Sequence, residues 1–88
     1  MDELARKIAK TFYGYYVERG LLDIVVGGYY PPIKKSTFRD LLERNGLDGD
    51  LEGLWEKELV YILDDDNGGW VYPSWDVKTI IRRWICLG

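Results

Sequence analysis

The first quarter of the chain carries apolar side chains at helical spacing. Between residues 2 and 19 they recur three or four positions apart, at Leu4, Ala5, Ile8, Ala9, Phe12, Tyr15 and Tyr16. This spacing is typical of an amphipathic helix with one buried face. Gly20 follows directly and is a common residue at a helix C-terminus. The pattern therefore predicts a first helix over residues 2–19.

The stretch that follows is apolar but has no clear period. Leu21–Val26 is partly β-branched, which fits either a short strand or a further buried helical turn. The pairs Gly27-Gly28 and Pro31-Pro32 then interrupt any regular element. For Leu21–Val26 both strand and helix stay open.

Two short helices are predicted next. The second helix can be capped by Ser36 or Thr37, and Gly46 lies just beyond its end. Its apolar positions are Phe38, Leu41 and Leu42. The third helix can be capped by Asp48 or Asp50, and its inward face is expected to hold Leu51, Leu54, Trp55 and Leu59, with Ile62 as a further candidate. Its outward face would then present Glu52, Gly53, Glu56 and Val60.

A hairpin and a last helix complete the pattern. Val60–Leu63 and Trp70–Tyr72 fit two strands around the turn Asp64–Gly69, in which Asn67-Gly68 is a strong hairpin signal. Pro73 ends the second strand and Ser74 can cap the final helix. That helix is expected to turn Val77, Ile80, Ile81, Trp84 and Ile85 inward.

The run from Thr37 to Tyr72 resembles the middle of a winged helix-turn-helix domain. A short helix ends in Asn-Gly-Leu, a second helix leads into a strand through Leu-Val-Tyr, and a Gly-rich hairpin follows. The resemblance implies an α+β fold over residues 1–88 as a single domain. A three-helix core would carry a C-terminal β-hairpin wing and a following C-terminal helix. It also implies DNA binding, with the third helix in the major groove, as in small regulators of archaea and their viruses. Other members of the family only dock proteins, so the resemblance does not choose between these roles.

The bulk composition fits such a domain. A chain of 88 residues with 47% apolar residues makes one domain with a thin core. The single cysteine, Cys86, cannot form an intramolecular disulfide. The charged start and the lack of an apolar run of about 18–20 residues predict a cytoplasmic protein without a membrane span. The absence of His and Gln beside 31% charged residues is typical of a thermophile.

Acidic residues concentrate where the resemblance implies DNA contact. Residues 48–66 hold eight acidic side chains and one base, Lys57, for a net charge of −7, while the rest of the chain is +4. Affinity for duplex DNA comes largely from lysine and arginine that neutralise phosphates. The third helix and the hairpin are therefore poor candidates for the DNA contact, and the acids are either a solvated surface or a face for a basic protein partner.

Basic residues gather elsewhere, and these are the candidates for contacts with the DNA backbone. One group surrounds the start of the second helix, where a helix N-terminus beside lysines can receive a phosphate. The second group lies on the last helix. The predicted contacts are Lys34, Lys35, Ser36, Thr37, Arg39, Lys78, Arg82 and Arg83.

Aromatic residues support the alternative function, a protein-interaction adaptor. Four of them sit at apolar helical positions and are expected in the core, namely Phe12, Phe38, Trp55 and Trp84. Six are harder to place inside a small domain: Tyr13, Tyr29, Tyr30, Trp70, Tyr72 and Trp75. Trp70 and Tyr72 share one face of their strand, and with Glu52 and Glu56 they form the predicted protein-interaction face. A homodimer through the terminal helices is a further expectation.

Catalysis has little support in the sequence. No histidine is present to act as a base or a metal ligand, and one cysteine without histidine is no nucleophile pair. The Asp64-Asp65-Asp66 run suggests calcium, but Trp75 stands where the closing glutamate of such a loop belongs. We therefore expect a non-enzymatic protein with no cofactor and no metal.

Overall fold

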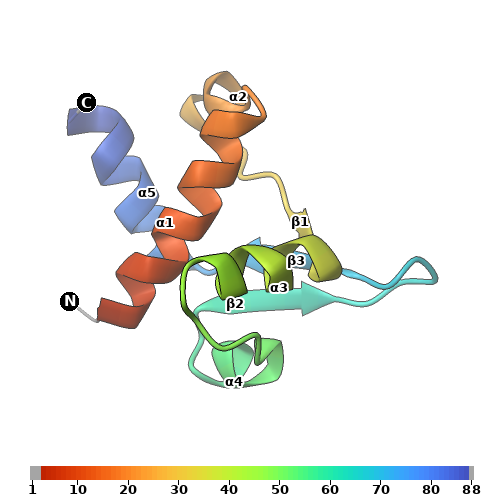
Figure 1. Ribbon diagram of the computed structural model, residues 1–88. Coiled ribbons are helices and arrows are strands. Elements are labelled where there is room, and N and C mark those ends of the chain that lie inside the picture. The colour runs from red at the N-terminus through yellow and green to blue at the C-terminus, as the bar shows by residue number, and fades with distance from the viewer. Residues whose placement is uncertain (1–2, 88) are drawn as a thin grey trace.

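The computed structural model describes residues 3–87 and shows a small α+β domain. Within that range, five helices surround one three-stranded antiparallel sheet (Figure 1). In chain order the elements are α1 (Glu3–Glu18), α2 (Leu22–Val26), β1 (Ile33–Lys34), α3 (Lys35–Arg44), α4 (Leu51–Glu56), β2 (Val60–Leu63), β3 (Trp70–Pro73) and α5 (Trp75–Leu87). The described parts of both chain ends lie on the same side of the molecule, and the hairpin loop extends from the other (Figure 1).

Helix α1 forms the centre of the helical part. Its buried side chains are Ala5, Ile8, Ala9, Thr11, Phe12 and Tyr16, which is the face that the spacing predicts. The helix packs along α5 and also touches α3. It ends because Gly20 adopts a φ of 68°, after which the Leu21 amide donates to the Tyr16 carbonyl at 2.8 Å.

Leu21–Val26, for which the sequence leaves strand and helix open, is helical. Helix α2 covers Leu22–Val26 and buries only Val25, while Ile24 and Val26 stay exposed. A strand here would need hydrogen bonds from a neighbouring strand, whereas a helical turn satisfies its own backbone. The Gly28 amide donates to the Val25 carbonyl at 2.9 Å and closes the turn.

The third strand lies where the sequence gives no signal for one. β1 is only Ile33–Lys34, directly after the Pro31-Pro32 pair, and the strand order is β1-β3-β2. Ile33 pairs with Val71 and Lys34 pairs with Trp70. A two-residue strand is too short to show alternation, so only its partner in space defines it.

The expected cap of α3 by Ser36 or Thr37 is wrong. The helix begins at Lys35, its N-cap is Lys34, and no side chain caps it. Strand β1 runs straight into the helix, and the Lys35 amide donates to the Gly69 carbonyl at 3.2 Å. The Gly69 carbonyl of the hairpin therefore accepts a hydrogen bond from an amide that a capping side chain would otherwise bind. Ser36 and Thr37 lie inside the first turn of the helix.

Helix α4 is capped as predicted but is shorter than expected. The Asp50 carboxylate accepts a hydrogen bond from the Gly53 amide at 3.1 Å. The helix ends at Glu56, and Glu58 takes a positive φ of 60° before β2 starts. Leu59 is buried, but it lies beyond the helix.

Two expectations about α4 are wrong as a consequence of its length. Val60 is fully buried in β2 and is not part of an outward helix face. Trp55 is 47% exposed and does not belong to the core. Leu51 and Leu54 are the buried residues of this six-residue helix, and Trp55, next to its last residue Glu56, is left uncovered.

The core lies between α1, α5, α3 and the inner face of the sheet. Ser74 caps α5 as predicted, accepting from the Val77 amide at 3.4 Å, and Val77, Ile80 and Ile81 are buried. Trp84, expected in the core, is only half-buried at its edge, where its ring meets Tyr13 edge-on. Tyr30, one of the six aromatic residues that are hard to place inside from the sequence, is buried at 8% exposure.

Tyr16 ties α1 to the loop before the sheet. Its ring is fully buried, and its hydroxyl donates to the Pro31 carbonyl at 2.7 Å. Burial, followed by the neighbouring Tyr30, raises the pKa of this phenol far above its ordinary value of 10.0. The hydroxyl is therefore protonated at neutral pH and donates to the Pro31 carbonyl.

Candidate functional site

The exposed side of α4 carries the Trp55 indole beside the carboxylates of Glu52 and Glu56. Glu52, Trp55 and Glu56 line one open surface hollow, and we call these three residues the α4 surface. They stand at positions i, i+3 and i+4, so they share one side of the helix. An exposed large aromatic ring beside acidic side chains offers apolar area and negative charge at the same place.

The outer face of the sheet is a second aromatic surface. Alternation along β2 and β3 turns Val71 and Val60 inward. The opposite side presents Lys34, Tyr61, Leu63, Trp70 and Tyr72, which we call the outer sheet face. Tyr61 pairs across the strands with Tyr72, and Leu63 pairs with Trp70. Trp70 and Tyr72 thus share a face as predicted, although both are half-buried by their neighbours.

The hairpin loop is organised by one carboxylate. Asp65 accepts hydrogen bonds from the Asn67 amide at 2.8 Å, the Gly69 amide at 3.0 Å and the Trp70 indole at 2.9 Å. These three hydrogen bonds explain why the acidic run forms a turn, because its middle residue, Asp65, accepts all of them.

The pKa of Asp65 is lowered chiefly by the hydrogen bond from the Asn67 amide, and the Trp70 indole and the Gly69 amide lower it further. A lowered pKa in the folded state means that the stabilisation is complete above the ordinary value of 3.8 and is lost as the pH falls through the folded value. Acidification through the folded pKa, which lies below 3.8, should therefore loosen the loop and release the Trp70 indole. The indole proton resonance of Trp70, followed by NMR against pH, measures this change.

Asp65→Asn should already show the loosened resonance at neutral pH. Asp66→Asn removes the same charge from the same turn and leaves the three hydrogen bonds in place, so it should resemble the wild type. A Trp70 indole that stays unchanged in Asp65→Asn would contradict the assignment of this carboxylate as the organiser of the loop.

Only some of the basic side chains at the start of α3 are available to bind an anion from solution. The Lys35 ammonium lies 2.8 Å from Asp64 and is itself largely covered. The Lys34 ammonium lies over the Trp70 ring at 5.8 Å from its centroid. Ser36 and Arg39 are exposed, while Thr37 is half-buried and lines a hollow between α1 and α3. Lys35, predicted as a phosphate contact, is therefore already neutralised by the hairpin.

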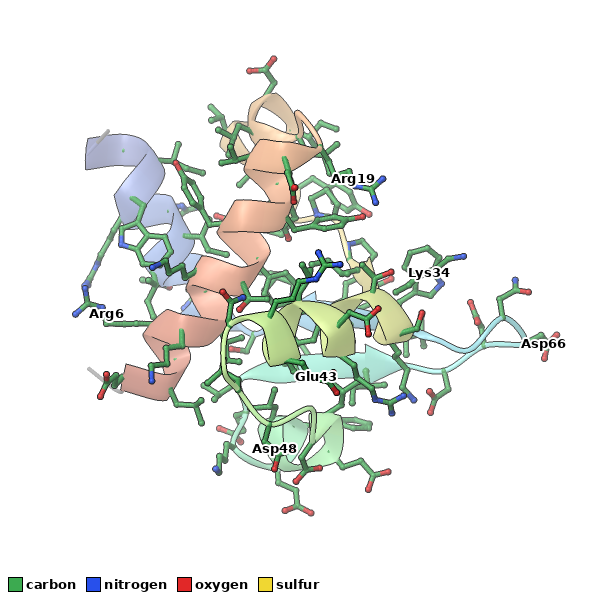
Figure 2. The ribbon with its side chains drawn as sticks, viewed as in Figure 1. Arg6, Arg19, Lys34, Glu43, Asp48 and Asp66 are labelled. Carbon is green, nitrogen blue, oxygen red and sulfur yellow. The ribbon has the colours of Figure 1, made fainter. Side chains whose placement is uncertain are left out.

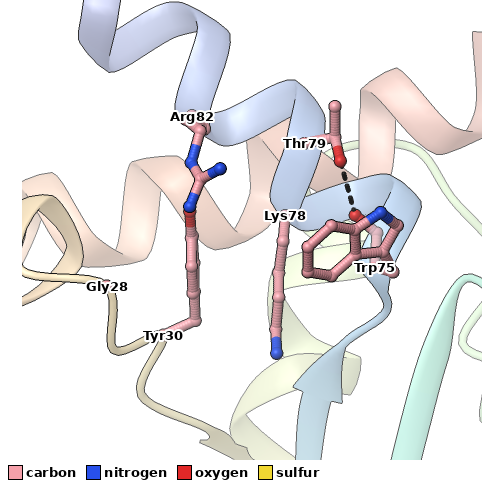
Figure 3. A pocket seen from close by; sticks show the side chains of 6 residues that line it. All are labelled: Gly28, Tyr30, Trp75, Lys78, Thr79 and Arg82. Carbon is pink, nitrogen blue, oxygen red and sulfur yellow. Dashed lines mark hydrogen bonds between the residues drawn. The ribbon is translucent and has the colours of Figure 1, made fainter.

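The second basic group divides between two sides of α5. Lys78 and Arg82 line a pocket with Gly28, Tyr30, Trp75 and Thr79 (Figure 3). Arg83 lines a different hollow, together with Asp76 and Lys57. Arg83 therefore lines a different hollow from Lys78 and Arg82, and Thr79 lines both hollows.

Acidic side chains lie at the hairpin tip and beside α4, while basic side chains lie on both sides of the molecule, with Lys34 on the hairpin side (Figure 2). Asp66 lies at the tip of the hairpin and Asp48 beside α4, whereas Arg6 lies on the opposite side from the hairpin (Figure 2). A surface of one sign attracts partners of the other sign and raises their rate of encounter. The α4 surface and the hairpin tip thus favour a cationic partner.

Sequence reasoning missed several residues of these surfaces. Trp55 was hidden by its apolar helical spacing, and Tyr61 and Leu63 by their place in an apolar strand. Strand alternation from Val60 contains the signal for Tyr61 and Leu63, since they stand one and three residues after the buried Val60. No local pattern gives the exposure of Trp55, because it depends on where α4 stops.

No protein-family model matches this chain, and no significant match was found among curated proteins or solved structures. Similarity therefore assigns neither a family nor a function, and the proposals below depend on the geometry of the chain itself. In the part of the chain that the structure describes, no helix is both long and apolar enough to span a bilayer.

Proposed function

We propose that this protein is a non-catalytic interaction module of winged-helix type that docks a basic protein segment on its α4 surface. The observation that carries the proposal is the exposure of Trp55, at 47%, in one hollow with the side chains of Glu52 and Glu56. A partner of matching chemistry carries lysine or arginine beside an apolar side chain.

The arrangement of elements supports the winged-helix part of the proposal. A two-residue strand precedes the helix pair α3 and α4, a hairpin follows it, and the strand order is β1-β3-β2. In such an arrangement, α4 takes the position of the helix that DNA-binding members place in the major groove. Here that helix ends in Lys57 as its C-cap, and its exposed side is acidic.

Energetics favour a protein over DNA at this surface. Residues that dominate protein interfaces are enriched in tryptophan, because a large ring buries much area at little entropic cost. Carboxylates beside such a ring raise the association rate of a basic partner and reject phosphates. Two glutamates facing a phosphate backbone would instead repel it, and the counterions whose release drives DNA binding would not be displaced.

The proposal is tested by selecting ligands from a random peptide library displayed on phage against the whole protein. Enriched peptides are expected to combine lysine or arginine with an aromatic or aliphatic residue. Trp55→Ala should weaken the best peptide by roughly 30-fold or more, as expected for a central interface tryptophan worth at least ~2 kcal/mol. Glu52→Lys combined with Glu56→Lys should abolish binding, because it replaces both attracting carboxylates by repelling ammonium groups.

Tyr29→Ala serves as the matched control, since Tyr29 is similarly exposed at 58% but lies outside the α4 surface. It should bind the peptide like the wild type. Peptides that bind Trp55→Ala as tightly as the wild type would overturn the proposal. Their loss in a variant of the outer sheet face, such as Tyr61→Ala, would instead place the docking site on the sheet.

Association with duplex DNA is the second candidate function. It is favoured by the hydrogen bond from the Lys35 amide to the Gly69 carbonyl, which joins the start of α3 to the hairpin and brings Lys34 beside it. Titration of a fluorescent duplex across a salt series tests it. Steep loss of binding with salt, abolished by Lys34→Glu with Lys35→Glu, supports this function, and no binding at low salt excludes it.

A further inference from the structure

One pocket combines exposed cations with aromatic rings and lies apart from the α4 surface. Trp75, Lys78, Thr79 and Arg82 supply one side of it at positions i, i+3, i+4 and i+7 of α5. These positions form a single stripe along a helix. Tyr30, from the loop before β1, supplies the other side (Figure 3). We call these five residues the α5 pocket.

The electrostatics of the α5 pocket favour an anion. Lys78 and Arg82 stand one helical turn apart, where like charges repel each other. No aspartate or glutamate is among the residues that line the pocket. Asp76, the acid nearest in sequence, lines the hollow of Arg83 instead. A bound anion would relieve this repulsion.

The aromatic residues add a requirement for a flat partner. Tyr30 is buried, and the Lys78 ammonium lies 5.5 Å from its ring centroid, within reach of a cation–π contact. Trp75 is 70% exposed, the highest value among the large exposed hydrophobic residues of the described chain. The Thr79 hydroxyl donates to the Trp75 carbonyl at 3.0 Å and is thereby already engaged within the helix. The Trp75 ring is thus a free stacking surface beside two cations.

We propose that the α5 pocket binds a nucleoside phosphate within a single-stranded nucleic acid. The base stacks on the Trp75 ring, and the adjoining phosphate lies between Lys78 and Arg82. An exposed tryptophan beside basic side chains is the combination that single strands require, since their bases are free to stack on a protein ring. In a duplex the bases stay stacked on one another, and a protein contacts mainly groove edges and phosphates. A free nucleotide has the same chemistry as one unit of the strand.

Fluorescence anisotropy of a labelled oligothymidylate of about ten nucleotides at low salt tests the proposal. Trp75→Ala should weaken binding roughly tenfold, because stacking of a base on an aromatic ring contributes on this order. Lys78→Glu with Arg82→Glu should abolish binding. Arg19→Glu with Arg44→Glu, which makes the same change of charge in a different hollow, should leave more of the affinity than the α5 pair.

Four outcomes decide the matter. Absence of binding by the wild type, or equal binding by Trp75→Ala, overturns the proposal. A duplex of the same length that binds as tightly as the single strand also overturns it. If thymidine monophosphate binds as tightly as the oligomer, the proposal of a single-stranded ligand is overturned, and the ligand of the pocket is a free nucleotide. Trp55→Ala should bind the oligomer like the wild type, so failure of the α4 proposal and failure of this one are distinguishable.

Discussion

Replacing Phe12 by alanine is expected to lower the free energy of unfolding by about 3–5 kcal/mol, the usual cost of removing a fully buried phenyl ring. The ring of Phe12 is completely buried, with its centroid 4.8 Å from that of Phe38 and 6.1 Å from that of Tyr16. Alanine would leave a cavity where α1 meets α3, and it would remove the contact that holds Tyr16 in place. A domain of this size has only about 5–15 kcal/mol in total, so the loss is a large fraction of it.

Thermal unfolding followed by far-ultraviolet circular dichroism measures this effect. The midpoint should fall by roughly 15 °C or more, given about 4–8 °C per kcal/mol for a domain of this size. Val17→Ala on the same helix is the control, because Val17 is 50% exposed and its truncation should change stability by at most about 0.5 kcal/mol. A Phe12→Ala midpoint as high as that of Val17→Ala would show that α1 is not held by this core.

Gly69→Ala is expected to disrupt the hairpin more than any other single methyl group added to its loop. Gly69 has a φ of 102°, a conformation that side chains adopt only at a cost of about 1–3 kcal/mol. A Cβ there would also lie 2.7 Å from the Lys35 Cδ, 2.8 Å from the Asp64 Oδ1 and 3.0 Å from the Leu63 carbonyl oxygen. The ion pair of Lys35 with Asp64 would have to open, and the backbone of β2 would have to move.

Gly68→Ala separates these two costs. Gly68 has nearly the same φ, 105°, but a Cβ there would meet nothing within 4 Å. It should therefore lose only the conformational part, and Gly69→Ala should lose roughly 1–3 kcal/mol more, the usual range for overpacking. Urea denaturation of both variants provides the comparison. Equal midpoints would mean that the Lys35 and Asp64 side chains move away from the added methyl group without lowering the free energy of unfolding.

The same substitution bears on the two candidate functions. Opening the pair frees the Lys35 ammonium, which the folded hairpin holds 2.8 Å from Asp64. If duplex DNA is a ligand, Gly69→Ala should not lose affinity through charge, since it adds an available cation at the start of α3. Peptide binding at the α4 surface should be unchanged.

Helices α1 and α5 were predicted well because each carries its own local signal. Helix α1 has a full apolar stripe and ends at Gly20, and α5 begins at its cap, Ser74. The hairpin was equally clear, since the turn residues Asp64–Gly69 separate two apolar strands. In each of these segments the hydrophobic period and the residues at its ends agree.

The errors fall where a neighbour in space outweighs the local pattern. Ser36 and Thr37 look like caps, but β1 pairing with β3 moves the start of α3 to Lys35. Trp55 looks like a core residue, but the positive φ of Glu58 and the early start of β2 leave α4 too short to bury it.

The candidate site shows the same division. The sequence by itself determined the acidic character of residues 48–66 and the basic groups outside it, because formal charge does not depend on folding. It also determined Trp70 and Tyr72 as neighbours on one strand face, because side chains alternate along any strand. The tertiary structure alone decided that Lys35 is neutralised by Asp64, that Tyr30 is buried beneath Lys78, and that Trp55 and Trp75 are exposed. Those facts depend on contacts between segments far apart in the chain, and exposure is a property of the packed molecule that no local period contains.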